Sequence, residues 1–381
     1  MMAAKISDLK EQDGIMTFTI SNTDVSYVNA IRRTILSDIP IVVFKTTPYE
    51  ENKANIIINT SRLNNEIIKQ RLSCIPICIS DFQDMSFKKY LLEVDVENKT
   101  DTLMIVTTKD FKIRNIETDK FLEDGEVKKI FPPFISPNGH EYYIDFLRLR
   151  PKISDEIPGE RIKLTCEFTV STARDDSTFN VTGTCSYGCT PDKTKIGEEL
   201  EIRKQKWKDE GKNQSEIDFE AANWVLLEGL RYVTKNSFDF IIQTVGIYEN
   251  EQIIIKACNI LNEKFEELQR LLSQDEIEIK ASDNTMENCY DVTLVNEDYT
   301  IGNILNYEIY KIFYTELKVL NYVGFKKMHP HDSDSILRLA LTDKTKGITS
   351  IKTLLNATIE EAIKRLKSIK GCFDGTRDGD K

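Results

Sequence analysis

The chain has 381 residues, which at about 150 residues per domain corresponds to two or three domains. Hydrophobic residues make up 40% and charged residues 30% of the sequence, and this balance excludes wholesale disorder. The 51 lysines and arginines against 62 aspartates and glutamates give a formal net charge of −11. This sign excludes a protein that wraps nucleic acid over its whole surface, so we expect little or no direct contact with DNA.

The sequence carries no signal for membrane insertion or secretion. Its longest apolar stretches, such as residues 240–242 and 253–255, are far shorter than the roughly 20 residues of a membrane-spanning helix. Residues 1–14 are rich in charge and lack the apolar core of a secretory signal. Eight cysteines are too few for a disulfide framework, so we expect reduced thiols. We therefore expect an intracellular protein that is not secreted and that does not contact a membrane.

The first predicted elements are a strand over residues 15–20 and a helix that begins near Val25. Residues 21–24 read Ser-Asn-Thr-Asp, and such side chains accept hydrogen bonds from the free N–H groups of a helix start. Apolar residues then recur at helical spacing up to Ser37, and Pro40 disfavours a longer helix. Extended segments are expected over residues 40–49 and 56–58.

A mainly β region follows between about residues 80 and 205. Short segments of alternating polarity, at residues 91–96, 103–106, 162–170 and 179–184, are separated by proline-rich turns. Residues 202–213 are charged and polar, which indicates an exposed helix or loop. Residues 238–248 are again typical of a strand.

The remaining elements include two long amphipathic helices. Apolar residues repeat every three or four positions over residues 253–272 and again over residues 351–369, and Gly371 is expected as the C-terminal cap of the second helix. Between them, strands are predicted at 277–279, 292–294, 322–325 and 336–341. A shorter helix should begin near residues 298–300.

The sequence contains an internal repeat. Residues 24–29 and residues 298–303 share the pattern Asp, any, Ser or Thr, any, any, Asn, at an offset of 298 − 24 = 274. Each copy is surrounded by a strand, a helix, a further strand and a long helix in the same order, so the two units could bury their apolar helical faces against each other in a pseudo-two-fold pair. The predicted pairing residues are Val28, Asn29, Ile31 and Ile35 in the first copy and Ile301, Asn303, Ile304, Leu305 and Ile309 in the second.

Six segments carry a resemblance to a known family. The run at residues 29–40, Asn-Ala-Ile-Arg-Arg-Thr-Ile-Leu-Ser-Asp-Ile-Pro, resembles the signature helix of the α-like subunits of multisubunit DNA-directed RNA polymerases. Residues 71–77 resemble the family's Arg-Leu-any-any-Ile-Pro-Leu segment. Residues 162–166 resemble a strand of the larger α-like subunit, and residues 238–246 resemble the return of the chain to its dimerisation domain. Residues 299–305 and 324–330 resemble the smaller α-like subunit. The two halves thus resemble the third- and eleventh-largest subunits of eukaryotic RNA polymerase II on one chain.

The resemblance implies an α+β fold with two dimerisation domains of the α-subunit type, paired within one chain. The first would comprise residues 1–45 and 216–275 and would be interrupted by a β-rich insert domain at residues 46–215; the second would comprise residues 276–381. In cellular eukaryotes and archaea the two parts are separate proteins, and in bacteria they form a homodimer. A single fused chain is similar to the arrangement in certain large DNA viruses.

The implied function is that of a noncatalytic assembly platform for DNA-templated transcription. The first half would bind the second-largest subunit, with Arg32 and Arg33 as docking residues, and the second half would face the largest subunit. Small zinc-binding subunits would join at the first half. The family's catalytic Mg²⁺ belongs to the largest subunit, so we expect Mg and Zn only in partner subunits and no active site in this chain. If the protein is viral, it should be in the cytoplasmic virus factory and the virion; the nucleus is also possible.

The only closely spaced cysteines are Cys74 with Cys78 and Cys185 with Cys189. Together they could supply four thiolates to zinc, but Cys74 and Cys78 fall in a predicted strand, where burial as core residues explains both. We therefore expect no metal in this chain. The alternative functions are a zinc or thiol enzyme that uses these pairs, or a diverged scaffold without polymerase partners.

Overall fold

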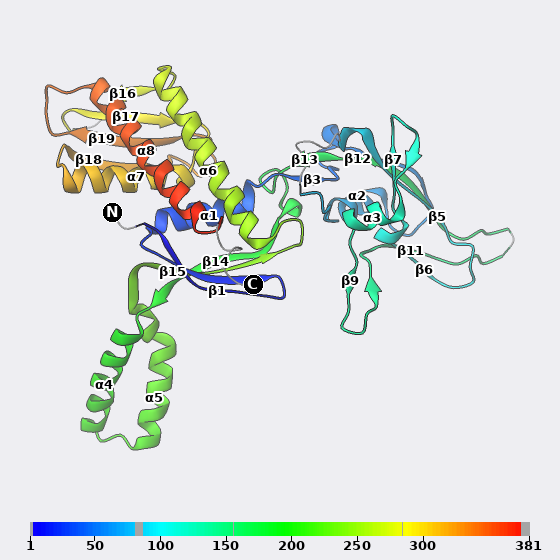
Figure 1. Ribbon diagram of the computed structural model, residues 1–381, viewed down its shortest axis with the longest axis horizontal. Coiled ribbons are helices and arrows are strands. Elements are labelled where there is room, and N and C mark those ends of the chain that lie inside the picture. Colours follow the sequence, from blue (N-terminus) through cyan, green and yellow to red (C-terminus); the bar gives the residue numbers. More distant parts are fainter. Residues whose placement is uncertain (1–2, 81–86, 155, 284, 375–381) are drawn as a thin grey trace. The chain divides into compact units, whose positions relative to one another are not determined.

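The structure is a computed structural model that describes residues 3–80, 87–154, 156–283 and 285–374 (Figure 1). These residues form a mixed α and β fold that groups into two compact units. The first unit comprises Met1–Ile35, Thr184–Gln243 and Ile254–Lys381, and the second comprises Leu36–Gly183 and Thr244–Ile253. The predicted division into domains at residues 45, 215 and 275 stays a prediction.

The first unit contains a four-stranded sheet with the order β1-β2-β15-β14. Its strands are β1 (Lys5–Gln12), β2 (Ile15–Ser21), β15 (Val233–Thr244) and β14 (Thr182–Pro191). Met16, Phe18 and Ile20 alternate along β2 and are buried, as expected for a strand with one covered face. Helix α1 (Val25–Ser37) follows this strand directly, and α6 (Asn250–Ser273) follows β15.

A second four-stranded sheet in the same unit has the order β16-β17-β19-β18. Its strands are β16 (Ile279–Ala281), β17 (Cys289–Leu294), β19 (Ser335–Leu341) and β18 (Leu320–Lys326). Helix α7 (Tyr299–Ile309) and its π-helical extension over Tyr310–Glu316 lie between β17 and β18 in the chain. The long helix α8 (Ile348–Gly371) follows β19. Gln269 of α6 donates a 2.9 Å hydrogen bond to Asn356 of α8, so the two long helices are in contact.

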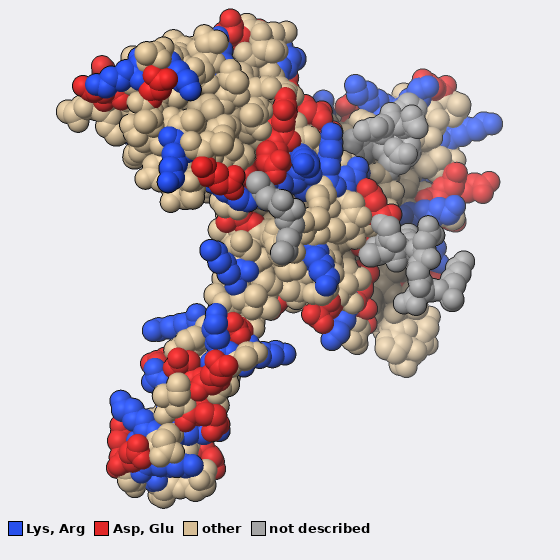
Figure 2. Space-filling view, turned by 60° about the vertical axis from the view of Figure 1, so that its left-hand side comes forward, with Lys and Arg blue, Asp and Glu red and all other residues tan. Residues whose placement is uncertain are grey.

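A helical hairpin lies between β14 and β15. It consists of α4 (Lys193–Asp209) and α5 (Gln214–Leu227), followed by a 3₁₀ turn at Gly229–Arg231. The side chain of Asn213 accepts a hydrogen bond from Glu216 N–H, and Glu216 in turn accepts from Asn213 N–H, which caps α5. Figure 2 shows charges of both signs over this hairpin.

The second unit is dominated by β structure. Its main sheet has the order β4-β12-β5-β7-β8, and three two-stranded ladders pair β3 with β13, β6 with β11 and β9 with β10. The strands are β3 (Ile41–Val43), β4 (Ala54–Asn59), β5 (Tyr90–Glu97), β6 (Met104–Thr107), β7 (Lys112–Asn115), β8 (Lys120–Phe121), β9 (Phe134–Ile135), β10 (Glu141–Tyr142), β11 (Asp145–Leu149), β12 (Arg161–Glu167) and β13 (Thr169–Ser171).

Two α-helices, α2 (Asn65–Ser73) and α3 (Asp124–Ile130), pack beside these strands (Figure 1). Short 3₁₀ turns occur at Tyr49–Glu51, Phe87–Lys89, Thr108–Asp110 and Ser177–Phe179. Buried side chains from α2, from the main sheet and from the ladders form one hydrophobic core. Among the described residues, no helix is long and apolar enough to span a lipid bilayer.

Several predicted elements are confirmed, and two details are wrong. Helix α1 begins and ends at the predicted residues, and α6, α7, α8, β18 and β19 lie where strands and helices are predicted. The predicted strand through Cys74 and Cys78 does not form, because α2 extends to Ser73 and Cys74 is its C-cap. Gly371 is the last residue of α8, and Cys372 is the cap. The polar stretch at residues 202–213, predicted as an exposed helix or loop, forms the end of α4 and the loop before α5, which confirms it; α5 itself was not predicted. The sequence also predicts a frayed tail over residues 374–381, and all of these except Asp374 lie outside the described residues.

Candidate pairing interface between α1 and α7

The two copies of the repeat start their helices in the same way. Ser26 N–H donates a 2.9 Å hydrogen bond to Oδ1 of Asp24 at the start of α1. Thr300 N–H donates a 2.8 Å hydrogen bond to Oδ1 of Asp298 at the start of α7. An aspartate in this position satisfies a free N–H group and places a negative charge at the positive end of the helix dipole. The first residue of the repeat therefore has the same local role in both copies.

Both helices bury the faces that the repeat predicts. Seven of the nine predicted pairing residues are buried: Val28, Ile31, Ile35, Ile301, Ile304, Leu305 and Ile309. The two asparagines, Asn29 and Asn303, are of intermediate exposure. This burial is what a packed helical face requires, and the role of these residues in dimerisation stays a prediction.

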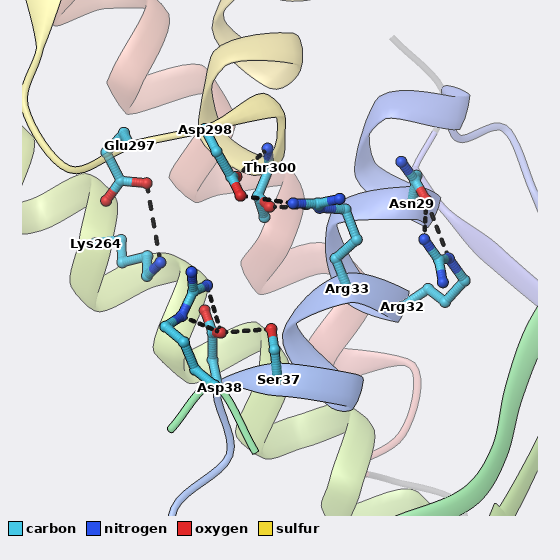
Figure 3. Close-up of polar contacts among 10 residues, drawn as sticks. Asn29, Arg32, Arg33, Ser37, Asp38, Lys264, Glu297, Asp298 and Thr300 are labelled. Carbon is cyan, nitrogen blue, oxygen red and sulfur yellow. Dashed lines mark hydrogen bonds and ion pairs between the residues drawn. The ribbon is translucent and has the colours of Figure 1, made fainter. Parts of the chain in front are cut away.

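An ion pair links the C-terminal half of α1 to the start of α7 (Figure 3). Nη2 of Arg33 lies 2.5 Å from Oδ2 of Asp298, and Nε of Arg33 donates a 2.9 Å hydrogen bond to Oγ1 of Thr300. Burial raises the pKa of Asp298, but the hydrogen bonds from Thr300 and the charge of Arg33 outweigh it, so the pKa lies below its ordinary value. Asp298 thus caps its own helix and binds the other helix at the same time.

A second polar contact is buried at the opposite end of α1. The hydroxyl of Tyr27 donates a 2.8 Å hydrogen bond to Oε1 of Glu308, and both residues are 0% exposed. Nε of Arg365, from α8, lies 2.6 Å from the same oxygen. Burial raises the pKa of Glu308, and the charge of Arg365 counters this only in part. Burial and the neighbouring Glu308 carboxylate also raise the pKa of Tyr27.

The two contacts fix the direction of the helix pair. The N-terminal turn of α1 contacts the last turn of α7 through Tyr27 and Glu308. The C-terminal half of α1 contacts the first turn of α7 through Arg33 and Asp298. The two helices therefore run antiparallel where they meet. The ring of Tyr307 lies edge-on to that of Tyr27, with centroids 6.4 Å apart, and packs beside the second contact.

The two predicted docking residues point in different directions (Figure 3). Arg33 contacts the second half of the chain, as described. Nε and Nη2 of Arg32 instead donate hydrogen bonds of 3.0 and 2.9 Å to Oδ1 of Asn29, one turn earlier on the same helix. Docking of a partner subunit by these arginines stays a prediction. Figure 3 also shows Lys264 of α6 with Glu297, 3.8 Å apart, next to the start of α7.

The four candidate cysteine ligands lie in ordinary structural positions. Cys74 and Cys189 are exposed, and Cys78 is partly buried with its Sγ 3.7 Å from the carbonyl oxygen of Gly246. Cys185 is buried on β14, and burial raises the pKa of its thiol to about 12. In the part of the chain that the structure describes, no three His, Cys, Asp or Glu side chains gather in a way that could hold a metal ion.

Sequence reasoning did not find Tyr27, Glu308 and Arg365. One signal was available for Glu308, because it stands seven residues after Ile301 on the apolar stripe of α7. A charged residue at a core position of a helix is rarely buried unless it is paired. Its partners could not be identified, since Tyr27 lies 281 positions away and nothing in the sequence places α8 beside α7.

Comparisons with known proteins find relatives of one kind. Residues 17–265 match the family model of the RNA polymerase Rpb3/Rpb11 dimerisation domain. The chain is 37% identical over 83 residues to subunit 3B of DNA-directed RNA polymerases IV and V from Arabidopsis thaliana, covering 22% of this chain and 23% of the relative. It is 25% identical over 292 residues to subunit RPAC1 of DNA-directed RNA polymerases I and III from Saccharomyces cerevisiae, covering 66% of this chain and 82% of the relative.

An archaeal relative is subunit Rpo3 of the DNA-directed RNA polymerase from Pyrococcus horikoshii, which is 36% identical over 73 residues, covering 19% of this chain and 26% of the relative. The similarity to this protein and to the plant subunit spans only about a quarter of their lengths.

Proposed function

The chain belongs to the family of RNA polymerase Rpb3/Rpb11 dimerisation domains, and from this premise we propose that it is a noncatalytic assembly-platform subunit of a DNA-directed RNA polymerase. The reaction, nucleotidyl transfer, would be performed by the other subunits of the complex. This chain would hold the two largest subunits together and would have no active site of its own.

The observation that carries the proposal is the contact of α1 with α7 inside one compact unit. Arg33 binds Asp298 and Tyr27 binds Glu308, so the signature helix of the first repeat copy is held against the helix of the second. We infer that both α-like halves are on one polypeptide and pair as two dimerisation domains, with the β-rich region inserted in the first. A fused chain of this kind is the viral-type arrangement.

Fusion changes the energetics of assembly. Two separate subunits must meet at their cellular concentrations, whereas linked halves meet at an effective concentration on the order of mM when the linker is short. Only a few residues separate α6, which ends at Ser273, from β16, which begins at Ile279. Pairing of the halves would therefore precede binding of the large subunits and would not depend on the supply of a second α-like protein.

The proposed partners are the largest and second-largest polymerase subunits and small zinc-binding subunits. The first half, with Arg32 and Arg33 as docking residues, would bind the second-largest subunit, and the second half would face the largest. Mg and Zn would be bound by partners, and contact with DNA would be small. The location follows from the source: the virus factory and virion for a viral protein, or the nucleus.

Affinity purification tests this proposal. The tagged chain is isolated from its native expression context at high salt, and the bound proteins are quantified by mass spectrometry. Both large polymerase subunits should remain bound in equal amounts. An Arg32→Ala variant should retain less of the second-largest subunit, while Lys206→Ala, exposed on α4, serves as the matched control and should retain it fully. A lone chain, or one bound to unrelated proteins, would contradict the proposal.

An enzymatic role for the cysteine pairs has little physical support. The thiolate is the form that attacks or binds metal, and burial raises the pKa of both Cys78 and Cys185. A metal assay on the purified chain addresses this alternative directly, since stoichiometric zinc would revive it. A diverged scaffold would be recognised by the absence of both large subunits in the purification.

A further inference from the structure

The pairing of α1 with α7 is asymmetric at one buried position. The offset of 274 between the two repeat copies relates Tyr27 to Ile301 and Thr34 to Glu308. The hydroxyl of Tyr27 donates to the fully buried carboxylate of Glu308. The residues at the equivalent positions, Thr34 and Ile301, cannot form such a bond, because isoleucine has no polar side-chain atom. This hydrogen bond therefore has no counterpart across the pseudo-two-fold axis.

The Arg33–Asp298 ion pair is different, because its acidic partner exists in both copies. Asp298 corresponds to Asp24, and Arg33 corresponds to Tyr307. Burial raises the pKa of Tyr307, and the carboxylate charge of Asp24 raises it further. Under the repeat offset, Asp24 is therefore the residue expected opposite Tyr307, as Asp298 is opposite Arg33.

These equivalences show which residues would meet if α1 paired with α1 of a second chain, and α7 with α7 of that chain. In a pair of α1 helices, Arg33 of each chain would face Asp24 of the other. In a pair of α7 helices, Asp298 would face Tyr307 and find no cation. Two monomers contain two arginine–aspartate ion pairs, one in each. A dimer with like pairs would also contain two, both between its α1 helices. These ion pairs therefore do not favour unlike pairs over like pairs.

The buried hydrogen bond does discriminate. In a pair of α7 helices, Glu308 would face Ile301 and lose its hydroxyl donor, while Arg365 from its own half would remain. In a pair of α1 helices, Tyr27 would face Thr34 and lose its charged acceptor. A buried carboxylate that loses a donor is costly, and a hydrogen bond to a charged group changes an equilibrium constant by about tenfold or more.

We propose that the Tyr27–Glu308 hydrogen bond is the specificity determinant that makes the two repeat copies pair with each other and not each with its own kind in a second copy of this chain. The proposal rests on the pairing of halves in the proposed function, but it does not depend on any polymerase subunit. Converting two monomers into one dimer with like pairs removes two such bonds. The dimerisation constant of the wild type should therefore be about a hundredfold lower than that of a chain without this hydrogen bond.

The experiment replaces each residue of the bond by its repeat equivalent in the full chain, giving Tyr27→Ile with Glu308→Thr. The wild type and the variant are unfolded in denaturant, refolded at a series of chain concentrations and equilibrated, and the dimer fraction is measured by size-exclusion chromatography with light scattering. The variant should dimerise with a constant about a hundredfold higher than the wild type. Tyr27→Phe, which removes only the hydroxyl, should show an increase as well and carries the test if the double variant does not refold.

Arg33→Tyr is the matched control, because it places the repeat equivalent at position 33 and removes the ion pair from unlike and like pairs alike. Its dimerisation constant should stay near that of the wild type. Two chains could also form a dimer by exchanging halves, with α1 of each chain paired to α7 of the other. Such a dimer keeps unlike pairs and the Tyr27–Glu308 contact. Its formation would therefore not explain a higher dimerisation constant in the variant than in the control.

Equal dimerisation constants for wild type, Tyr27→Phe and the double variant would overturn the proposal. The assembly-platform function is tested separately: it would be contradicted if the two large subunits did not remain bound in the affinity purification. The pairing of halves itself would be contradicted if Tyr27→Phe left the free energy of unfolding unchanged.

Discussion

Arg33 and Asp298 are 265 positions apart in the sequence, and Nη2 of the arginine lies 2.5 Å from Oδ2 of the aspartate. The aspartate is the first residue of the second repeat copy, and the arginine follows the first copy on α1. One contact therefore connects the start of one helix to the body of the other. It is strengthened by the hydrogen bond from Arg33 to Thr300, which makes it a defined geometry and not a loose surface ion pair.

A double-mutant cycle should detect this contact. Arg33→Ala and Asp298→Asn should each lower the free energy of unfolding by about 1–2 kcal/mol, because a charge-assisted hydrogen bond in a partly buried site is lost. The double variant should cost less than the sum of the two. Asparagine also caps helices, so Asp298→Asn tests the ion pair with the cap preserved. Arg32→Ala is the control and should cost less than about 0.5 kcal/mol, since Arg32 donates its hydrogen bonds to Asn29 of its own helix. Strict additivity in denaturant titrations would contradict the contact.

The buried carboxylate of Glu308 predicts a specific pH dependence. Its pKa is raised in the folded protein by burial, so the folded state binds this proton more tightly than the unfolded state does. Its contribution to stability is complete below the ordinary glutamate pKa of about 4.3 and is lost as the pH rises through the folded value. The unfolding free energy of the wild type minus that of Glu308→Gln should therefore fall as the pH rises from about 4. If this difference rose with pH over the same range, the pKa of Glu308 would be lowered and not raised by folding, which would contradict the prediction.

Asp291 of β17 should show the opposite trend. Nε and Nη2 of Arg338 donate hydrogen bonds of 2.6 and 2.7 Å to its two carboxylate oxygens, and these bonds lower its pKa. Stability from this pair is present above the ordinary aspartate pKa of about 3.9 and is lost as the pH falls through the folded value. Asp291→Asn should cost about 1–2 kcal/mol at neutral pH and less in acid. A cost that stays constant with pH in denaturant titrations would contradict the assignment.

Gly302 should not tolerate a side chain. A Cβ atom at this position of α7 would lie 2.0 Å from the ring of Phe325 on β18, so the helix or the ring would have to shift. Gly302→Ala should destabilise the protein by about 1–3 kcal/mol through overpacking. Gly197→Ala, in the interior of α4 with open space around the added atom, is the matched control and should stabilise by about 0.5–1 kcal/mol. Equal effects in thermal unfolding would contradict the close approach of α7 and β18.

Local signals in the sequence predicted the elements that carry the pairing helices. The cap at Asp24 and the proline at position 40 are short-range features, and they placed both ends of α1 correctly. The repeat placed the start of α7. Helix α5 was missed because its apolar residues, including Ile217, Phe219 and Trp224, do not follow one stripe.

The contacts of the site could not be predicted, because they join distant segments. Tyr27 reads as one more apolar residue of α1, and only the fold brings its hydroxyl to Glu308. The error at Cys74 has a local cause: the side chain of Asn64 accepts a hydrogen bond from Ile67 N–H and starts a helix that ends next to the cysteine. That cap was overlooked in favour of the alternating pattern after it.

Native mass spectrometry of the purified polymerase tests the central claim most directly. If both α-like halves are on this chain, the complex should contain one copy of the 43.9 kDa chain with one copy each of the two largest subunits, and no separate α-like protein. Two copies of this chain per complex, or one copy together with a second α-like subunit, would contradict the account.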